Sequence, residues 1–161
     1  MSHRFDCEVV GELDKFAGRV AAWLCKAPCY EVSYPDGCNS ENWPVDEIWK
    51  LNQETFSRVR NCGNVYAIFV GNGATWSFRY IGKSKPESLG GRLRQHFIGP
   101  QPEAKCPPHS KHVEIKQAVC ERQLVGFSCV DVRPGELNVY VEAWIQRTRK
   151  PEWNERDEAG G

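Results

Sequence analysis

Apolar residues recur every three or four positions in two segments near the start of the chain. This spacing predicts two amphipathic helices, over residues 13–26 and 45–58. Pro44 suits the first turn of the second helix, whose Ile48 and Leu51 are expected to face inward. The beginning of the chain is therefore predicted to be a helical arm.

Runs of β-branched and aromatic residues predict the strands. Residues 65–70 (VYAIFV) and 76–81 (WSFRYI) flank the turn sequence GNGAT, a pattern typical of a β-hairpin. Further strands are expected over residues 124–132 and, within the arm, over residues 30–34. The hairpin is the strongest local pattern in the chain.

Helical patterns occupy much of the remaining chain. They predict helices over residues 89–97, 112–123 and 138–148, the last of them capped by Asn138. The proline-rich residues 99–108 are expected to form an exposed loop. The fold class is therefore α+β, with a β-β-α-α-β-α order that follows the arm.

Length and composition are those of an ordinary globular chain. The 161 residues suffice for one core, divided into an N-terminal helical arm (residues 1–60), a core domain (residues 61–155) and a tail (residues 156–161). No segment approaches the ~18 apolar residues of a membrane span, and the N-terminus has acids where a signal peptide is apolar. We therefore expect a cytoplasmic protein with no membrane partner.

The formal net charge is zero, but the charge is unevenly distributed. Residues 1–57 carry ten acids and five bases, whereas residues 58–161 carry eleven acids and sixteen bases. An acidic arm in front of a basic domain can bind a polyanion locally although the total charge is zero. Solvated surface charge accounts for the same distribution equally well.

Cysteine and histidine raise the question of zinc. Two compact groups are present, CPPHSKH at residues 106–112 and three spaced cysteines within residues 25–38. Neither group supplies the second pair of ligands that structural zinc sites use at recognisable spacings. Reduced, scattered thiols are the better account of the eight cysteines.

The sequence RYIGKS, residues 79–84, ends like a phosphate-binding P-loop. That motif requires a glycine five positions before Gly82, and Ser77 stands there. The chain is therefore not expected to bind a nucleotide in the manner of P-loop proteins.

Six polar residues of the core domain occur in an order that resembles the GIY-YIG nuclease family. They are Tyr66, Tyr80, Arg92, His96, Glu142 and Asn154. The first half-motif is changed to NVY (residues 64–66), the second is intact as YIG (residues 80–82), and the asparagine lies in PEWN (residues 151–154). The resemblance covers about 90 residues, from position 64 to position 154.

This resemblance implies a three-stranded antiparallel sheet flanked by helices and a nuclease that hydrolyses phosphodiester bonds of DNA. In such an enzyme Glu142 would bind Mg²⁺, which Mn²⁺ can replace, and Arg92 would contact the scissile phosphate. Tyr66 would activate the attacking water, Tyr80 would orient the water or the phosphate, and His96 would assist. The choice of general base stays open between Tyr66 and His96.

The residue types also suit this chemistry without reference to the family. Mg²⁺ is usually bound through one or two carboxylates, and Glu87 is the only acid in residues 65–100, which argues against a two-metal site. Arg92 can contact a phosphate bidentately, as lysine cannot. Tyr66 could act as a base if Arg92, the metal or Lys83 lowers its pKa from about 10.

Another nuclease signature is nominally present. Pro35-Asp36 and Glu114-Ile115-Lys116 spell PD…ExK, which marks a different metal-dependent fold. However, 77 residues separate the two acids, and the glutamate falls in a predicted helix. This alternative is weak.

The compact architecture favours a stand-alone restriction or phage-defence endonuclease that acts on double-stranded DNA, as a two-fold dimer where the site is palindromic. The basic residues expected to contact DNA are Lys83, Lys85, Arg94, Arg147 and Arg149. A repair, structure-specific or mobile-element nuclease of the same family is one alternative. A DNA-binding module that does not cut is another.

Overall fold

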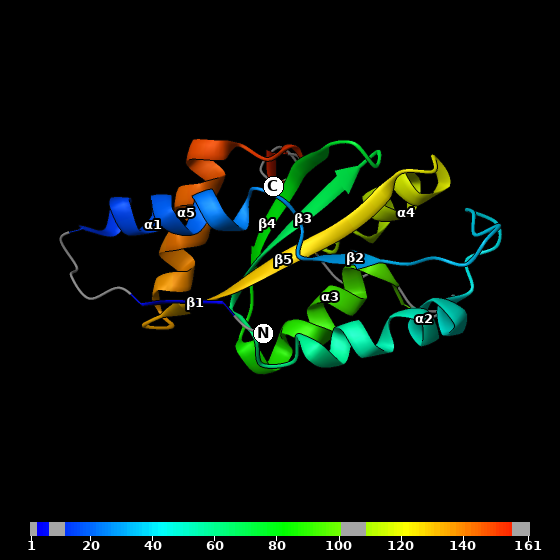
Figure 1. Cartoon of the computed structure of the whole chain (residues 1–161), viewed down its shortest axis with the longest axis horizontal. Helices are drawn as coiled ribbons and strands as arrows, with labels where there is room; N and C mark the ends of the chain where they lie inside the picture. Colours follow the sequence, from blue (N-terminus) through cyan, green and yellow to red (C-terminus); the bar gives the residue numbers. More distant parts are fainter. Residues whose placement is uncertain (1–2, 7–11, 101–108, 156–161) are drawn as a thin grey trace.

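A computed structural model of the chain describes residues 3–6, 12–100 and 109–155. These residues form a mixed α+β fold around a five-stranded, mostly antiparallel sheet (Figure 1), which confirms the predicted fold class. The strands are β1 (Arg4–Asp6), β2 (Tyr30–Val32), β3 (Val65–Gly71), β4 (Trp76–Lys83) and β5 (Leu124–Arg133). The helices are α1 (Leu13–Leu24), α2 (Val45–Arg58), the 3-10 helix η2 (Pro86–Ser88), α3 (Leu89–Phe97), α4 (His112–Cys120) and α5 (Leu137–Arg149).

The centre of the sheet is the antiparallel trio β4-β3-β5. β3 and β4 form the predicted hairpin, which contains one β-bulge. Ile68 pairs with Tyr80 and Phe69 pairs with Phe78, so Arg79 is the extra residue on β4. Because directly paired residues share a face of the sheet, the bulge places Tyr80 on the same face as Tyr66.

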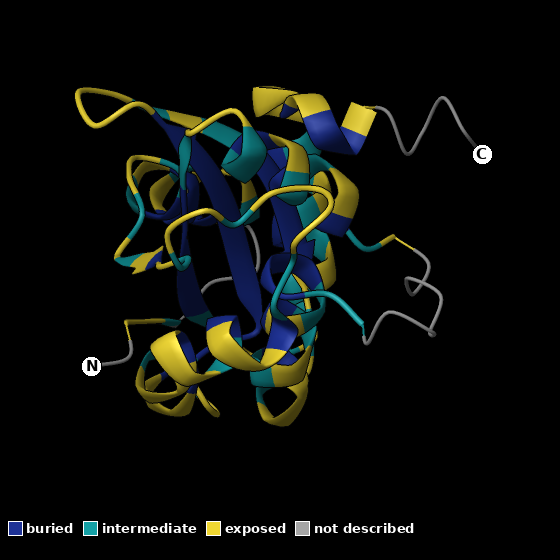
Figure 2. Cartoon of the chain, turned by 90° about the vertical axis from the view of Figure 1, so that its right-hand side faces the viewer, coloured by how far each residue is buried: buried dark blue, intermediate teal, exposed yellow. Residues whose placement is uncertain are grey.

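The sheet separates two helical layers, each with its own buried cluster. Alternate residues of β3, beginning with Tyr66, contribute to the cluster that α2, α3 and α4 cover. The other residues of β3, beginning with Val65, contribute to the cluster that α1 and α5 cover. With both faces covered, every residue of β3 is buried, and the strands form the dark interior of Figure 2.

The first 60 residues add strands as well as helices. β2 pairs antiparallel with the first part of β5, and β1 pairs parallel with its last part. The rings of Tyr30 and Phe127, which are opposite one another in this pairing, stack with centroids 5.1 Å apart. The arm therefore lines the outer edge of β5 and shares the core of the central trio.

Two predictions of detail are wrong. Leu51 is 54% exposed, because α2 turns Asn52 inward instead. The Asn52 side chain accepts a hydrogen bond from the Ser33 N–H and donates one to the Ser33 carbonyl, both at 2.8 Å, which ties α2 to the segment after β2. Asn138 does not cap α5, since the cap position is Glu136 and the Asn138 amide instead donates to the Asn64 carbonyl.

Most of the predicted loop over residues 99–108 lies outside the described residues, as does Cys106. In the described part of the chain, every helix is too short or too polar to cross a lipid bilayer.

Candidate active site

A cavity of about 290 Å³ opens at the edge of the sheet formed by β4. Its lining brings together residues from β3, β4, α3, α5 and the chain ends flanking them: Tyr66, Tyr80, Lys83, Arg92, His109, Glu142, Gln146 and Asn154. Five of the six residues expected to be catalytic are among them, although they are spread over 89 positions of the sequence. We call this cavity the β4 pocket.

Tyr66 reaches the β4 pocket across a glycine. Its cross-strand partner is Gly82, and a Cβ atom at that position would lie 2.4 Å from the Tyr66 ring carbon Cζ and its hydroxyl oxygen. No side chain fits into that space, so Gly82 is required because the Tyr66 ring occupies it. The Tyr66 and Tyr80 rings then lie side by side, with centroids 6.2 Å apart.

Replacing Gly82 by alanine is therefore expected to displace the Tyr66 ring. Overpacking of this kind typically costs about 1–3 kcal/mol of unfolding free energy, and a 1 Å misplacement of a reacting group can cost about 10²-fold in rate. Thermal melting and DNA-cleavage rates measure the two effects. The matched control is Gly91→Ala on the exposed face of α3, where an added Cβ meets nothing within 4 Å. Parental cleavage by Gly82→Ala would contradict the assigned role of Tyr66.

His96 is fully buried directly behind Tyr66. Its Nδ1 accepts the Lys111 backbone N–H at 2.9 Å, so in the neutral ring the proton is on Nε2. Nε2 therefore donates to the Tyr66 hydroxyl oxygen, 2.8 Å away. Burial, followed by the charges of Arg92 and Lys111, lowers the pKa of His96 to about 3, so the ring is neutral at pH 7.

This network assigns different positions to the two candidate bases. His96 does not line the β4 pocket, and both of its ring nitrogens are engaged. Tyr66 lines the pocket and, because its oxygen accepts from His96, its own proton is free to point elsewhere. His96 is thus placed to orient Tyr66, whereas Tyr66 is placed to meet a ligand.

The ionisation of Tyr66 differs from the condition stated for a base. Burial is the largest influence and raises the pKa of its hydroxyl well above 10, and Tyr80 adds to the rise. Arg92 opposes the rise but does not overcome it. In the substrate-free pocket, Tyr66 is therefore a protonated hydroxyl group.

Arg92 is the guanidinium of the β4 pocket. It lies close enough to both tyrosine hydroxyls for their charge and hydrogen bonding to raise its pKa, against the opposing effect of burial. Its Nη1 also donates to Gln95 Oε1 at 3.3 Å. α3 supplies the residue because its inner face is anchored by Leu89, Leu93 and Phe97, which are fully buried as their spacing predicts.

Glu142 is the carboxylate of the pocket lining, and its side chain is 15% exposed. Lys83 Nζ lies 3.3 Å from Glu142 Oε1, so β4 and α5 contribute one charge each to an ion pair at the mouth of the pocket. Burial raises the pKa of the Glu142 carboxyl, while the charges of Lys83 and Arg92 oppose that rise. The pocket thus holds one carboxylate between two cations.

Asn154 lines the pocket, but its amide is fully used elsewhere. Its Oδ1 accepts the Ile81 N–H at 2.8 Å and its Nδ2 donates to the Ile81 carbonyl at 2.9 Å. The side chain thus pairs with the outer edge of β4 as a neighbouring strand would. Asn154 is a positioning residue that fixes the C-terminal segment against the strand carrying Tyr80.

The residue that departs from the family motif has a similar function. Asn64 stands where the resemblance would place glycine, and it is buried. Its amide exchanges hydrogen bonds with the backbone N–H and C=O of Val132 at 2.8 and 2.9 Å, which extends the pairing of β3 with β5 by one residue. Asparagine at this position therefore stabilises the strand that carries Tyr66.

Of the five basic residues expected to contact DNA, only Lys83 lines the β4 pocket. Arg94 points to another surface, where its guanidinium lies 4.4 Å from the centre of the Trp49 ring. Lys85 precedes η2 and is exposed. The remaining two, Arg147 and Arg149, are exposed on the last turn of α5.

Sequence reasoning did not connect three residues with the site. Gln146 follows Glu142 by one helical turn and lines the same pocket, which the spacing of four on a predicted helix could have shown. His109 lines the pocket, and Lys111 is 2% exposed with its Nζ 5.3 Å from the centre of the Tyr80 ring. No local signal identifies these two, because the loop that carries them returns to the site only in the folded chain.

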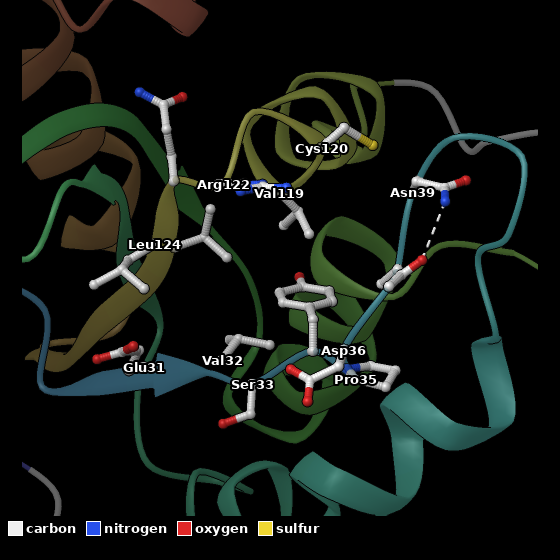
Figure 3. Close-up of a pocket in the computed structure, with 15 residues that line it drawn as sticks. Glu31, Val32, Ser33, Pro35, Asp36, Asn39, Val119, Cys120, Arg122 and Leu124 are labelled. Atoms are coloured by element: carbon white, nitrogen blue, oxygen red, sulfur yellow. Dashed lines mark hydrogen bonds between the residues drawn. The ribbon is translucent and has the colours of Figure 1, made fainter.

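A larger cavity, of about 720 Å³, lies elsewhere (Figure 3). Its walls are β2 with the loop that follows it and, facing them, the end of α4 with the start of β5. None of the residues expected to be catalytic lines it. Size alone therefore does not locate the chemistry in this protein.

Among the described residues, no group of three or more His, Cys, Asp or Glu side chains is arranged to hold a metal ion. The three spaced cysteines within residues 25–38 therefore form no such cluster, and each of them is a free thiol. A single carboxylate such as Glu142 falls outside that criterion.

Comparison of the chain with protein-family models, with curated proteins and with solved structures found no match in any of the three.

Proposed function

We propose that the chain is a metal-dependent endonuclease that hydrolyses phosphodiester bonds of DNA. The observation that carries this proposal is the β4 pocket, in which Arg92, Lys83, Glu142 and the Tyr66 hydroxyl border one volume. Phosphodiester hydrolysis needs positive charge around the phosphate, a ligand for a cation and a polar group next to the attacking water. The four side chains offer one group for each of these tasks.

The donor set suits Mg²⁺. This ion prefers oxygen ligands and is commonly bound through one or two carboxylates while it keeps several waters. Glu142 offers such a carboxylate, partly exposed and beside the pocket. A Mg²⁺ ion bound there, or Mn²⁺ in its place, would supply positive charge next to the oxygens of the scissile phosphate.

The side chains of the pocket would divide the remaining work. Arg92 would hold the non-bridging oxygens of the phosphate with its planar fork, and Tyr80 beside it would orient the same group. Lys83 would leave its ion pair with Glu142 to meet a phosphate oxygen. Tyr66 would contact the attacking water, with His96 holding its hydroxyl in place from behind.

A general-base role for Tyr66 requires that its proton leaves. Among the groups around it, Arg92 is the one whose charge favours that loss, while burial and Tyr80 oppose it. His96 is a weaker candidate, since its ring nitrogens are engaged with Tyr66 and Lys111. We therefore assign water contact to Tyr66 and orientation to His96.

Two further observations support DNA as the substrate. The excess of bases lies in residues 58–161, which contribute every residue of the pocket. The central β4-β3-β5 trio and its flanking helices also have the arrangement that resemblance to the GIY-YIG family predicts. With so compact a chain, recognition and cutting would reside in one unit, which favours a restriction or defence enzyme, dimeric on a palindromic site.

Digestion of plasmid and phage DNA with Mg²⁺ or Mn²⁺, followed by sequencing of the ends, tests the proposal. We expect discrete fragments that share one end sequence, and no effect of ATP. A smear, or cutting confined to branched DNA, would instead support the repair or structure-specific alternative. DNA binding without any cutting would support the non-catalytic module and contradict the proposed activity.

A further inference from the structure

A second cavity adjoins the β4 pocket. It has a volume of about 640 Å³ and is lined by Ala143, Gln146, Arg147, Lys150, Asn154 and Glu155. Gln146 and Asn154 line both cavities, so the two hollows share a wall along one side of α5. A ligand longer than one phosphodiester can therefore extend from the first hollow into the second. We call the second hollow the α5 cavity.

The α5 cavity contains two cations. Neither the Arg147 nor the Lys150 side chain forms an ion pair or hydrogen bond with another residue of the described part of the chain. Both are exposed, and Glu155 is the carboxylate on the same lining. The cavity is therefore positively charged overall and open to solvent.

The spacing along α5 orders these groups. With a rise of about 1.5 Å per residue, Arg147 lies roughly 7.5 Å and Lys150 roughly 12 Å beyond Glu142 along the helix direction. One strand of duplex DNA presents a phosphate about every 3.4 Å of helix axis. The two cations thus lie within a few nucleotides of a phosphate bound beside Glu142.

We propose that the α5 cavity is a subsite for the sugar-phosphate backbone flanking the cut, in which Arg147 and Lys150 bind phosphates of the strand being cleaved. The substrate is then a polynucleotide strand and not an isolated phosphodiester. This inference rests on the proposed nuclease function, because it takes the scissile phosphate to lie in the β4 pocket.

A simpler explanation exists for basic residues at this place. Cations in the last turn of a helix interact favourably with its C-terminal carbonyl groups. That explanation makes no distinction between residues that line a cavity and those that do not, and Arg149 on the same turn lines neither hollow. It also predicts an effect on helix stability and none on DNA binding.

The salt dependence of DNA binding tests the subsite without knowledge of a recognition sequence. Binding of a short fluorescent DNA duplex is measured over a range of salt concentrations in EDTA, where a metal-dependent nuclease cannot cut. Each phosphate contact contributes about −0.9 to the slope of log K against log salt concentration. The double variant Arg147→Gln/Lys150→Gln is expected to reduce the magnitude of that slope by about 2 relative to the parent.

A matched control changes the net charge equally at another place. Lys50 and Arg58 are exposed on α2, and Arg58 also stands in the last turn of its helix. Lys50→Gln/Arg58→Gln should leave the slope unchanged, and both double variants should melt near the parental temperature.

Equal slopes for the parent and the Arg147→Gln/Lys150→Gln variant would overturn the subsite, and so would an equal reduction in both double variants. If the parent still cuts DNA in either case, the nuclease proposal stands and only the subsite fails. If the parent neither binds nor cuts DNA, both proposals fail.

Discussion

Replacing Glu142 by glutamine is expected to reduce DNA cleavage by about 10²–10³-fold or more, the usual cost of removing one group that stabilises the transition state. Glutamine keeps the shape of the side chain but loses the charge that would hold Mg²⁺. The fold should be little affected, because the partner Lys83 is 41% exposed and such pairs contribute about 0–1 kcal/mol. Initial cleavage rates over a Mg²⁺ titration measure the effect.

Two features make the Glu142→Gln result specific. Any residual activity should require a higher Mg²⁺ concentration than the parent, since the cation has lost its carboxylate. The control is Glu87→Gln, an exposed glutamate in η2 that does not line the β4 pocket. Parental rates for Glu142→Gln would remove Glu142 from the site.

Replacing Arg92 by lysine is expected to lower kcat by about 10²–10³-fold, although the positive charge is retained. Lysine cannot reproduce the planar fork with which arginine holds two phosphate oxygens. It would also lose the contacts that place the guanidinium between the Tyr66 and Tyr80 hydroxyls. The loss should fall mainly on kcat, because those contacts matter most when charge develops on the phosphate.

The control for this substitution is Arg19→Lys, at an exposed position of α1 on the other side of the sheet. It changes the same functional group and should leave kcat unchanged. If lysine at position 92 supports parental kcat, Arg92 serves only as a general positive charge, and the bidentate phosphate contact is wrong.

Local periodicity was sufficient to predict most of the elements. The hairpin and α3 follow from short-range patterns, because strand alternation and helical spacing are encoded within a few residues. The α2 boundaries match the prediction, but its inward face does not, since Asn52 replaces Leu51 there by bonding to the Ser33 backbone. That bond joins residues 19 positions apart, so no local window contains it.

Long-range pairings account for the rest of the difference. β1 lies at the end of β5, but its three residues have no pattern that identifies this partner. The bulge at Arg79 decides which face Tyr80 occupies, and a one-residue shift of this kind is not visible in the alternation of a single strand. His109 and Lys111 join the site for the same reason, through a return of the chain that local sequence does not specify.

The candidate site shows a similar division. The resemblance grouped Tyr66 with His96 but left both as candidate bases, because it carries no information about hydrogen bonds behind the pocket. Lys111 decides the question geometrically, since its backbone N–H occupies His96 Nδ1. A main-chain donor of this kind can come from any residue type except proline, so its identity leaves no trace in the sequence.

The position of β1 and β2 along β5 has a consequence for how this chain can be divided. The outer edge of β5 makes its backbone hydrogen bonds with strands drawn from the first 60 residues. A fragment beginning near position 61 would keep the β4 pocket residues but leave that edge bare, and unpaired edges recruit strands from other molecules. The pocket is therefore not a cassette that can be transplanted or exchanged by recombination without its leader. In this protein the segment before the motif and the motif itself must be inherited together.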